Sequence, residues 1–190
     1  MDDRRETTHR KMIEAAGRQF REHGFAGIGV AGVAKAAGVT SGAFYDHFGS
    51  KSGAFEAALV AGLDEVIAAI PQFRQAHGDD WLAAFTDYYL GRGHREDGQR
   101  LCVMTSLSAD VARSSPALKK IYEAKMSEIA GLIAQGLAAG DGAQRLEHAW
   151  QILSALIGGL TLARASASQA QSDSIAAAVR KNVLDVAMGR

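Results

Sequence analysis

A helical pattern of apolar residues runs through almost the whole 190-residue chain, and it constrains the fold more than any other feature. Proline, which interrupts helices, occurs only at positions 71 and 116. No segment keeps for long the apolar–polar alternation that marks a half-buried strand. With 47% hydrophobic residues the chain has the apolar content of a folded domain. The sequence therefore predicts an all-α globular protein.

The net charge of the chain excludes no class of partner, and the charge of its N-terminal part weakly favours DNA. The 21 Lys+Arg balance 21 Asp+Glu, so the whole chain has no excess that would attract nucleic acid or a membrane surface. Residues 1–51 hold eight basic and six acidic residues, a net charge of +2, which has the sign expected of an N-terminal DNA-binding unit.

Cysteine content and hydropathy indicate the compartment. The single cysteine, Cys102, excludes an internal disulfide and a multi-cysteine metal site, and it lies in an apolar run that favours burial. No apolar run reaches about 18 residues, and the charged N-terminus has no signal-peptide core. We expect a cytoplasmic protein that has no membrane contact.

The periodicity predicts a series of helices separated by glycine, serine and proline. The first ends at Gly24, and the fourth has Ser50 as its N-cap and ends before Pro71. The expected helices cover about residues 8–23, 30–37, 41–48, 50–69, 81–89, 101–113, 116–138, 144–165 and 173–188.

The two short helices, about residues 30–37 and 41–48, carry the strongest functional signal. Neither is long enough to be stable alone, and the turn between them contains Gly38, as in a helix-turn-helix unit. Phe44 and Phe48 lie at i and i+4, so both are expected to face inward. The N-terminal end and the outer face of the second helix would then be free to enter a major groove.

The residues around this unit resemble the N-terminal domain of the TetR family of transcriptional repressors over about residues 8–57. The motif positions are Arg10 to Ala16, Phe20, Gly24-Phe25, Val33-Ala34, Ala36 to Val39, Gly42, Phe44-Tyr45, His47-Phe48 and Lys51. The resemblance implies a homodimer that binds a palindromic operator in double-stranded DNA and releases it when a small-molecule inducer binds the C-terminal helices. It also implies that Tyr45, His47 and Lys51 contact phosphates and that Thr40, Ser41, Gly42 and Ala43 lie against bases.

Three positions depart from the family pattern. Ile28 and Gly29 stand where the family usually has Thr or Ser before the first short helix, and Ser41 stands where a basic residue is frequent. Asp46, also expected on the DNA-facing surface, introduces a carboxylate that is unfavourable near phosphates unless it accepts from a cytosine amine.

The C-terminal region offers two interpretations of its aromatic residues. They form ordinary core or, as the resemblance implies, line a mostly apolar inducer cavity. The residues expected at that cavity are Trp81, Phe85, Tyr88, Tyr89, Met104, Leu107, Tyr122 and Met126. The last two helices carry wide apolar stripes and the pair Gly158-Gly159, so we expect the homodimer to form through about residues 144–188.

No catalytic, metal-binding or cofactor motif is convincing. Gly27 to Gly32 matches a dinucleotide fingerprint but lacks the preceding strand, and the single Glu-x-x-His at Glu6 to His9 lacks the partners of a di-iron site. We predict a repressor without enzymatic activity, with a DNA-binding domain at 1–57 and a ligand-binding and dimerisation domain at 58–190. The alternative is a helical small-molecule-binding protein or enzyme that uses the C-terminal cavity without binding DNA.

Overall fold

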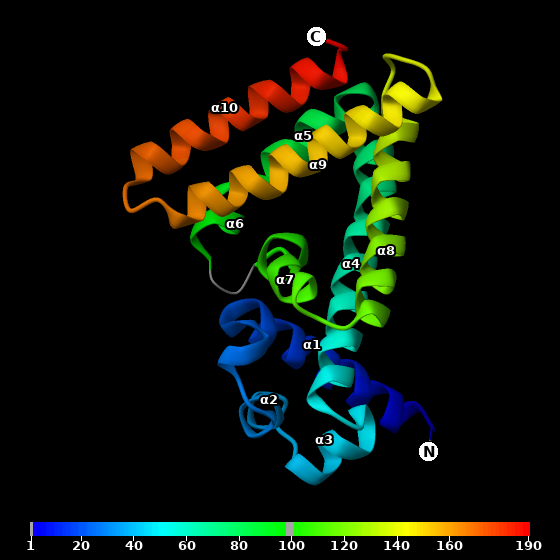
Figure 1. Cartoon of the computed structure of the whole chain (residues 1–190), viewed down its shortest axis with the longest axis vertical. Coiled ribbons are helices and arrows are strands. Elements are labelled where there is room, and N and C mark those ends of the chain that lie inside the picture. Colours follow the sequence, from blue (N-terminus) through cyan, green and yellow to red (C-terminus); the bar gives the residue numbers. More distant parts are fainter. Residues whose placement is uncertain (1, 98–100) are drawn as a thin grey trace. The chain divides into compact units, whose positions relative to one another are not determined.

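The structure, a computed structural model, describes residues 2–97 and 101–190, and the all-α prediction is confirmed for this part of the chain (Figure 1). The elements in chain order are α1 (Asp2–Gly27), α2 (Val30–Ala36), α3 (Ser41–Phe48), α4 (Lys51–His77), the 3-10 turn η1 (Gly78–Asp80), α5 (Trp81–Tyr89), α6 (Arg92–Glu96), α7 (Val103–Ala112), α8 (Pro116–Gly136), α9 (Gly142–Ala165) and α10 (Gln169–Ala187).

The described chain divides into two compact units. The first unit comprises the residues up to Asp64 together with Leu101–Glu123, and the second comprises the rest. Two long helices, α4 and α8, therefore contribute residues to both units. The expected boundary between residues 57 and 58 separates a DNA-binding domain from a ligand-binding domain. The two units are defined by packing, not by function, so this boundary stays a prediction.

The first unit is built around α1. Met12, Ala16 and Phe20 lie on one face of this helix and are buried, and α1 packs against both α2 and α7. The Phe20 and Phe25 rings both meet Phe55 of α4 edge-to-face, with centroids 5.2 Å apart in each pair. The expected stop at Gly24 is confirmed, since this residue leaves the helical conformation at φ 71° and ψ 171°.

The second unit is dominated by α9 and α10, which run side by side (Figure 1). A Cβ built on Gly159 of α9 would lie 2.5 Å from a methyl group of Val179 in α10, so the two helices approach at a distance that only glycine permits. Helix α5 packs against both of them. Its buried residues Trp81, Phe85 and Tyr89 supply the aromatic part of this core.

Several helix boundaries differ from the sequence prediction, most of all at Pro71. The prediction that the fourth helix ends before Pro71 is wrong, because α4 continues to His77 with Pro71 inside it. A proline in a helix interior costs about 3 kcal/mol, and apolar contacts around it offset this cost. Ile70 is fully buried, and the Phe73 ring lies 5.4 Å from Phe85, edge-to-face.

A second difference comes from an overlooked cap, and a third is an additional helix. Helix α10 begins at Gln169 because the Ser168 hydroxyl accepts a hydrogen bond from the Gln171 amide. The short helix α6 was not expected, and the Arg95 side chain ties it to α10 through Ser172 (2.7 Å) and Asp173 (2.6 Å). Arg95 and Ser172 are 77 positions apart, so no helical periodicity in the sequence could have indicated this contact.

Candidate functional site

The turn between α2 and α3 has the geometry expected from Gly38. This residue adopts φ 69°, the left-handed conformation that costs glycine least. The Gly38 amide donates to the Lys35 carbonyl (3.1 Å) and the Val39 amide donates to the Ala34 carbonyl (3.0 Å). These two bonds form a Schellman motif, which satisfies the last carbonyls of α2 and directs the chain into α3.

Helix α3 has one buried face. Phe44 is fully buried, and its ring lies 5.1 Å from Phe48 and 5.7 Å from Tyr45. The expectation that both phenylalanines face inward is confirmed in full for Phe44, whereas Phe48 is half-buried. Packing from behind holds this eight-residue helix in place and leaves its other face to solvent.

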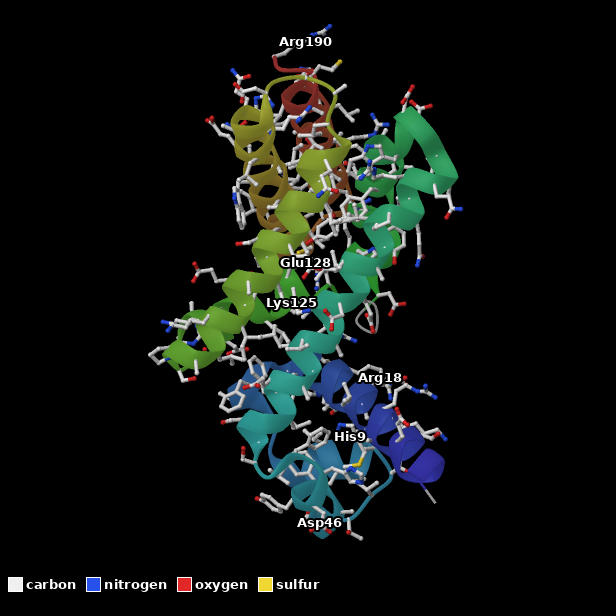
Figure 2. All side chains as sticks on the ribbon, turned by 90° about the vertical axis from the view of Figure 1, so that its right-hand side faces the viewer. His9, Arg18, Asp46, Lys125, Glu128 and Arg190 are labelled. Carbon is white, nitrogen blue, oxygen red and sulfur yellow. The ribbon has the colours of Figure 1, made fainter. Side chains whose placement is uncertain are left out.

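Most of the residues expected to contact DNA are on the accessible side. Thr40, Ser41, Gly42, Tyr45 and Asp46 are exposed. Figure 2 shows Asp46 at the outer end of this unit. Ala43, His47 and Lys51 are half-buried.

Thr40 also has a structural role. It is the N-cap of α3, and its hydroxyl oxygen accepts from the Ala43 amide at 3.2 Å. Its hydroxyl hydrogen is not used by this bond and can still be donated.

Lys51 is held at the start of α4 by two local features. The Ser50 hydroxyl accepts from the Gly53 amide (3.0 Å), which confirms the expected N-cap. The Lys51 ammonium nitrogen lies 4.5 Å from the centroid of the Phe25 ring, a cation–π contact. The charge is thus placed beside α3 rather than left on a freely rotating side chain.

His9 of α1 was missed as a functional residue. Its Nδ1 lies 3.2 Å from Nδ1 of His47, and the two rings stack with centroids 5.3 Å apart. His9 also packs 5.4 Å from the Phe48 ring. The two histidines are 38 positions apart, so no local pattern in the sequence could have joined them.

Asp110 of α7 is a second residue that sequence reasoning missed. Its carboxylate accepts from the Phe25 amide at 3.0 Å, just after the break at Gly24. This bond joins the end of α1 to α7, and both helices belong to the first unit.

The eight residues expected at an inducer cavity have different environments. Phe85, Tyr89, Met104, Leu107 and Met126 are buried, while Tyr88 is 54% exposed. Tyr122 is half-buried with its hydroxyl 2.6 Å from that of Ser108. Burial is the main cause that raises the pKa of Tyr122, and the Ser108 hydrogen bond partly offsets it. Trp81 lines a cavity in the second unit, and the role of the other seven stays a prediction.

No group of three or more His, Cys, Asp or Glu among the described residues could hold a metal ion. No described helix is long and apolar enough to cross a membrane. Cys102 is buried, as its apolar neighbours predicted.

Comparison with known proteins concerns the N-terminal region most directly. Residues 12–58 match the sequence profile of the family described as "Bacterial regulatory proteins, tetR family". The same region is 49% identical over 47 residues to the HTH-type transcriptional regulatory protein RaaS of Mycobacterium tuberculosis. That match covers 25% of this chain and 22% of RaaS.

Solved structures extend the likeness to the rest of the fold. Reduced NemR of E. coli covers 92% of this chain and 96% of its own, with a TM-score of 0.77 and 20% identity. A TetR-family regulator from Cytophaga hutchinsonii covers 98% and 96%, with a TM-score of 0.80 and 17% identity. At these identities the likeness shows the fold alone. Taken with the helix-turn-helix geometry, the profile match identifies residues 12–58 as an N-terminal domain of the kind found in the tetR family of bacterial regulatory proteins.

Proposed function

We propose that the protein is a ligand-responsive transcriptional repressor that binds a palindromic operator as a homodimer and is released by a small-molecule inducer. The observation that carries this proposal is α3, which is anchored from behind by Phe44 and presents an exposed N-terminal end and outer face. We assign DNA binding to residues 1–57, and ligand binding and dimerisation to residues 58–190. We propose no enzymatic activity, and we place the protein in the cytoplasm, where bacterial DNA is accessible.

The DNA-facing roles divide by chemistry. Tyr45, His47 and Lys51 would donate to phosphates, which fixes the register of α3 on the duplex. Thr40, Ser41, Gly42 and Ala43 are small residues at the N-terminal end of α3, where side chains and amides reach base edges. The exposed Asp46 carboxylate is repelled by phosphates, so we assign it to a cytosine amine in the major groove.

Dimerisation is supported by an exposed apolar face on α9. Leu146, Trp150 and Leu162 are 42%, 39% and 61% exposed. They lie at multiples of four positions with Ser154 and Gly158 between them, so each residue neighbours the next along a row that winds by about 160° around the helix. Large apolar side chains that gather on one surface indicate an interaction site. Pairing of α9 and α10 with the same helices of a second copy would cover it through an isologous interface.

Release by an inducer follows from the geometry of operators. Two recognition helices reach successive major grooves only when their centres are about 34–36 Å apart. An inducer lowers DNA affinity if it binds more tightly to a dimer whose recognition helices have another spacing. The loss of DNA affinity is limited by the ratio of the inducer's affinities for this dimer and for the DNA-competent dimer. Helix α4 is a direct covalent link for this coupling, since it begins at Lys51 and continues into the second unit.

The test is selection of bound duplexes from a random library, followed by affinity measurement across a range of salt concentrations. We expect enrichment of a palindrome and a logarithmic salt slope of about −0.9 per phosphate contacted. Failure to bind any duplex at low salt would favour the alternative, a helical small-molecule-binding protein or enzyme that does not bind DNA.

A further inference from the structure

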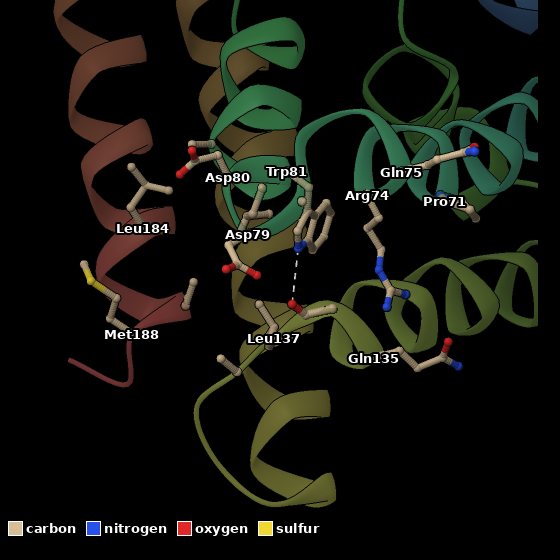
Figure 3. A pocket seen from close by; sticks show the side chains of 16 residues that line it. Pro71, Arg74, Gln75, Asp79, Asp80, Trp81, Gln135, Leu137, Leu184 and Met188 are labelled. Carbon is tan, nitrogen blue, oxygen red and sulfur yellow. Dashed lines mark hydrogen bonds between the residues drawn. The ribbon is translucent and has the colours of Figure 1, made fainter.

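A cavity of about 820 Å³ opens in the second unit where several helices end (Figure 3). The last turns of α4, α8 and α10, together with η1 and the start of α5, form its walls. A volume of this size accommodates a drug-sized molecule.

One wall of the cavity is a fixed aromatic surface. The indole Nε1 of Trp81 donates to the Gly136 carbonyl at 3.2 Å. A Cβ on Gly136 would lie 2.6 Å from the Trp81 ring, so the ring packs directly on the backbone of α8. Leu184 of α10 and Met188, the residue after this helix, contribute aliphatic surface to the same cavity. The arrangement suits the apolar body of a ligand.

The charged residues at the cavity are unbalanced. Asp79 and Asp80 contribute two carboxylates, and Arg74 contributes one guanidinium. Asp80 occupies the N-cap position of α5, yet its side chain accepts no capping hydrogen bond. Figure 3 shows neither carboxylate bonded to another lining residue. Both are therefore available to a ligand.

The backbone adds to this negative potential. The last carbonyls of a helix lack partners within it and carry roughly half a negative charge. The ends of α4, α8 and α10 all border the cavity, and η1 and α5 begin there. The three C-terminal ends outnumber the two N-terminal ends, which adds to the excess of carboxylates.

We propose that this cavity binds a small organic cation that has an apolar body, and that such a molecule is the inducer. The aromatic and aliphatic walls take up the body, and Asp79 and Asp80 pair with the cationic group. The assignment as inducer rests on the function proposed above, whereas the binding itself does not. Pro71, Arg74 and Gln75 of the lining belong to α4, the helix that starts at Lys51 beside α3.

Binding is tested on the full-length protein by isothermal titration calorimetry with three probes that share a benzene ring. We expect benzyltriethylammonium to bind saturably at least about tenfold more tightly than benzyl alcohol or benzenesulfonate, which corresponds to about 1.4 kcal/mol of discrimination. Equal affinity for the three probes, preference for the sulfonate, or no saturation by the cation at millimolar concentration would each overturn the proposal.

Removing an acidic or a basic charge from the cavity should change the affinity for benzyltriethylammonium in opposite directions. The double variant Asp79→Asn/Asp80→Asn should weaken binding of benzyltriethylammonium about tenfold, and Arg74→Gln should strengthen it about threefold, since it removes the like charge. The control Glu65→Gln/Glu128→Gln removes the same net charge at exposed positions outside the lining and should leave the affinity unchanged. An Asp79/Asp80 variant that binds the cation as tightly as the unmodified protein would exclude this site.

The proposal that such a cation is the inducer is tested separately, by measuring operator affinity in its presence. Benzyltriethylammonium added to the protein–operator complex should raise the apparent dissociation constant for DNA, and in Asp79→Asn/Asp80→Asn the same response should require about tenfold more of the cation. If the cation binds in calorimetry but leaves operator affinity unchanged, the cavity is a cation site without the inducer role. If no duplex binds at all, the proposed repressor fails while the calorimetric result stands.

Discussion

Nδ1 of His9 lies 3.2 Å from Nδ1 of His47, which joins the first helix of the chain to the helix proposed to enter the major groove. A hydrogen bond between two Nδ1 atoms requires that one of them carries a proton and the other does not. When His9 donates, the proton of a neutral His47 is on Nε2 and can be donated to a phosphate. With His9 as the donor, the pair therefore sets both the orientation and the tautomer of His47; the Nδ1–Nδ1 distance fits either direction of donation.

We therefore predict that His9 positions His47. The variant His9→Ala should weaken operator binding about three- to tenfold, the usual effect of one lost hydrogen bond, in fluorescence anisotropy at fixed salt. In a His47→Ala background the same change should have no further effect. Two independent, additive losses would show that His9 does not act through His47.

Lys51 and Tyr45 are predicted to contact phosphates without reading sequence. Lys51→Ala should weaken binding to many duplexes alike and reduce the steepness of the salt dependence by about one unit. Tyr45→Ala should also weaken binding without changing the preferred sequence. Lys120→Ala removes an equal charge from α8 and serves as the control. Unchanged binding in both test variants would remove these residues from the interface.

The two adjacent glycines of α9 should respond differently to alanine. In Gly159→Ala the new methyl group meets Val179, a stiff β-branched residue, so the variant should lose about 1–3 kcal/mol of unfolding free energy. Gly158 has open space around it in the single chain. Gly158→Ala should therefore gain up to about 1 kcal/mol of monomer stability from helix propensity. Chemical denaturation of the two variants measures both effects.

Leu162 is predicted to lie at the dimer interface. Leu162→Glu should convert the dimer to a monomer in sedimentation velocity, because a buried, unpaired carboxylate is strongly unfavourable. Ala124→Glu adds the same charge at an exposed position of α8 and should stay dimeric. A Leu162→Glu protein that sediments as a dimer would place the interface elsewhere.

The link between Arg95 and Asp173 should make stability depend on pH. The hydrogen bond from Arg95 is the main cause that lowers the pKa of Asp173 from its ordinary value of 3.8. A carboxyl group whose pKa is lower in the folded state stabilises the fold above its unfolded pKa, and the contribution is lost as pH falls through the folded pKa. The thermal midpoint of the unmodified protein should fall more steeply below pH 4 than that of Asp173→Asn. Parallel curves would contradict this role.

Much of the proposed DNA-binding domain, residues 1–57, could be predicted from sequence because its signals are local. The stop at Gly24, the positive φ of Gly38 and the Ser50 cap each depend on a few neighbouring residues. The inward face of α3 follows from the i, i+4 spacing of Phe44 and Phe48. A fixed order of such signals is also what makes the family resemblance recognisable over residues 8–57.

Pro71 is a position where a sequence rule for helix ends fails. Its missing amide predicts a helix end, and α4 passes through it because Ile70 and Phe73 continue to pack on both sides. The overlooked cap at Ser168 likewise moved the start of α10. Burial can outweigh the free energy of one backbone hydrogen bond, and that competition is decided by residues distant in sequence.

The amino-acid sequence by itself determined an all-α fold, a helix-turn-helix near the N-terminus and the apolar stripes of the last helices. Only tertiary structure decided that His9 meets His47, that Asp110 completes the first unit, and that Asp79 and Asp80 share a cavity with the end of α10. The physical reason is range. Helix periodicity and caps act over about four residues, whereas these contacts join side chains tens of positions apart and exist only after the helices have packed.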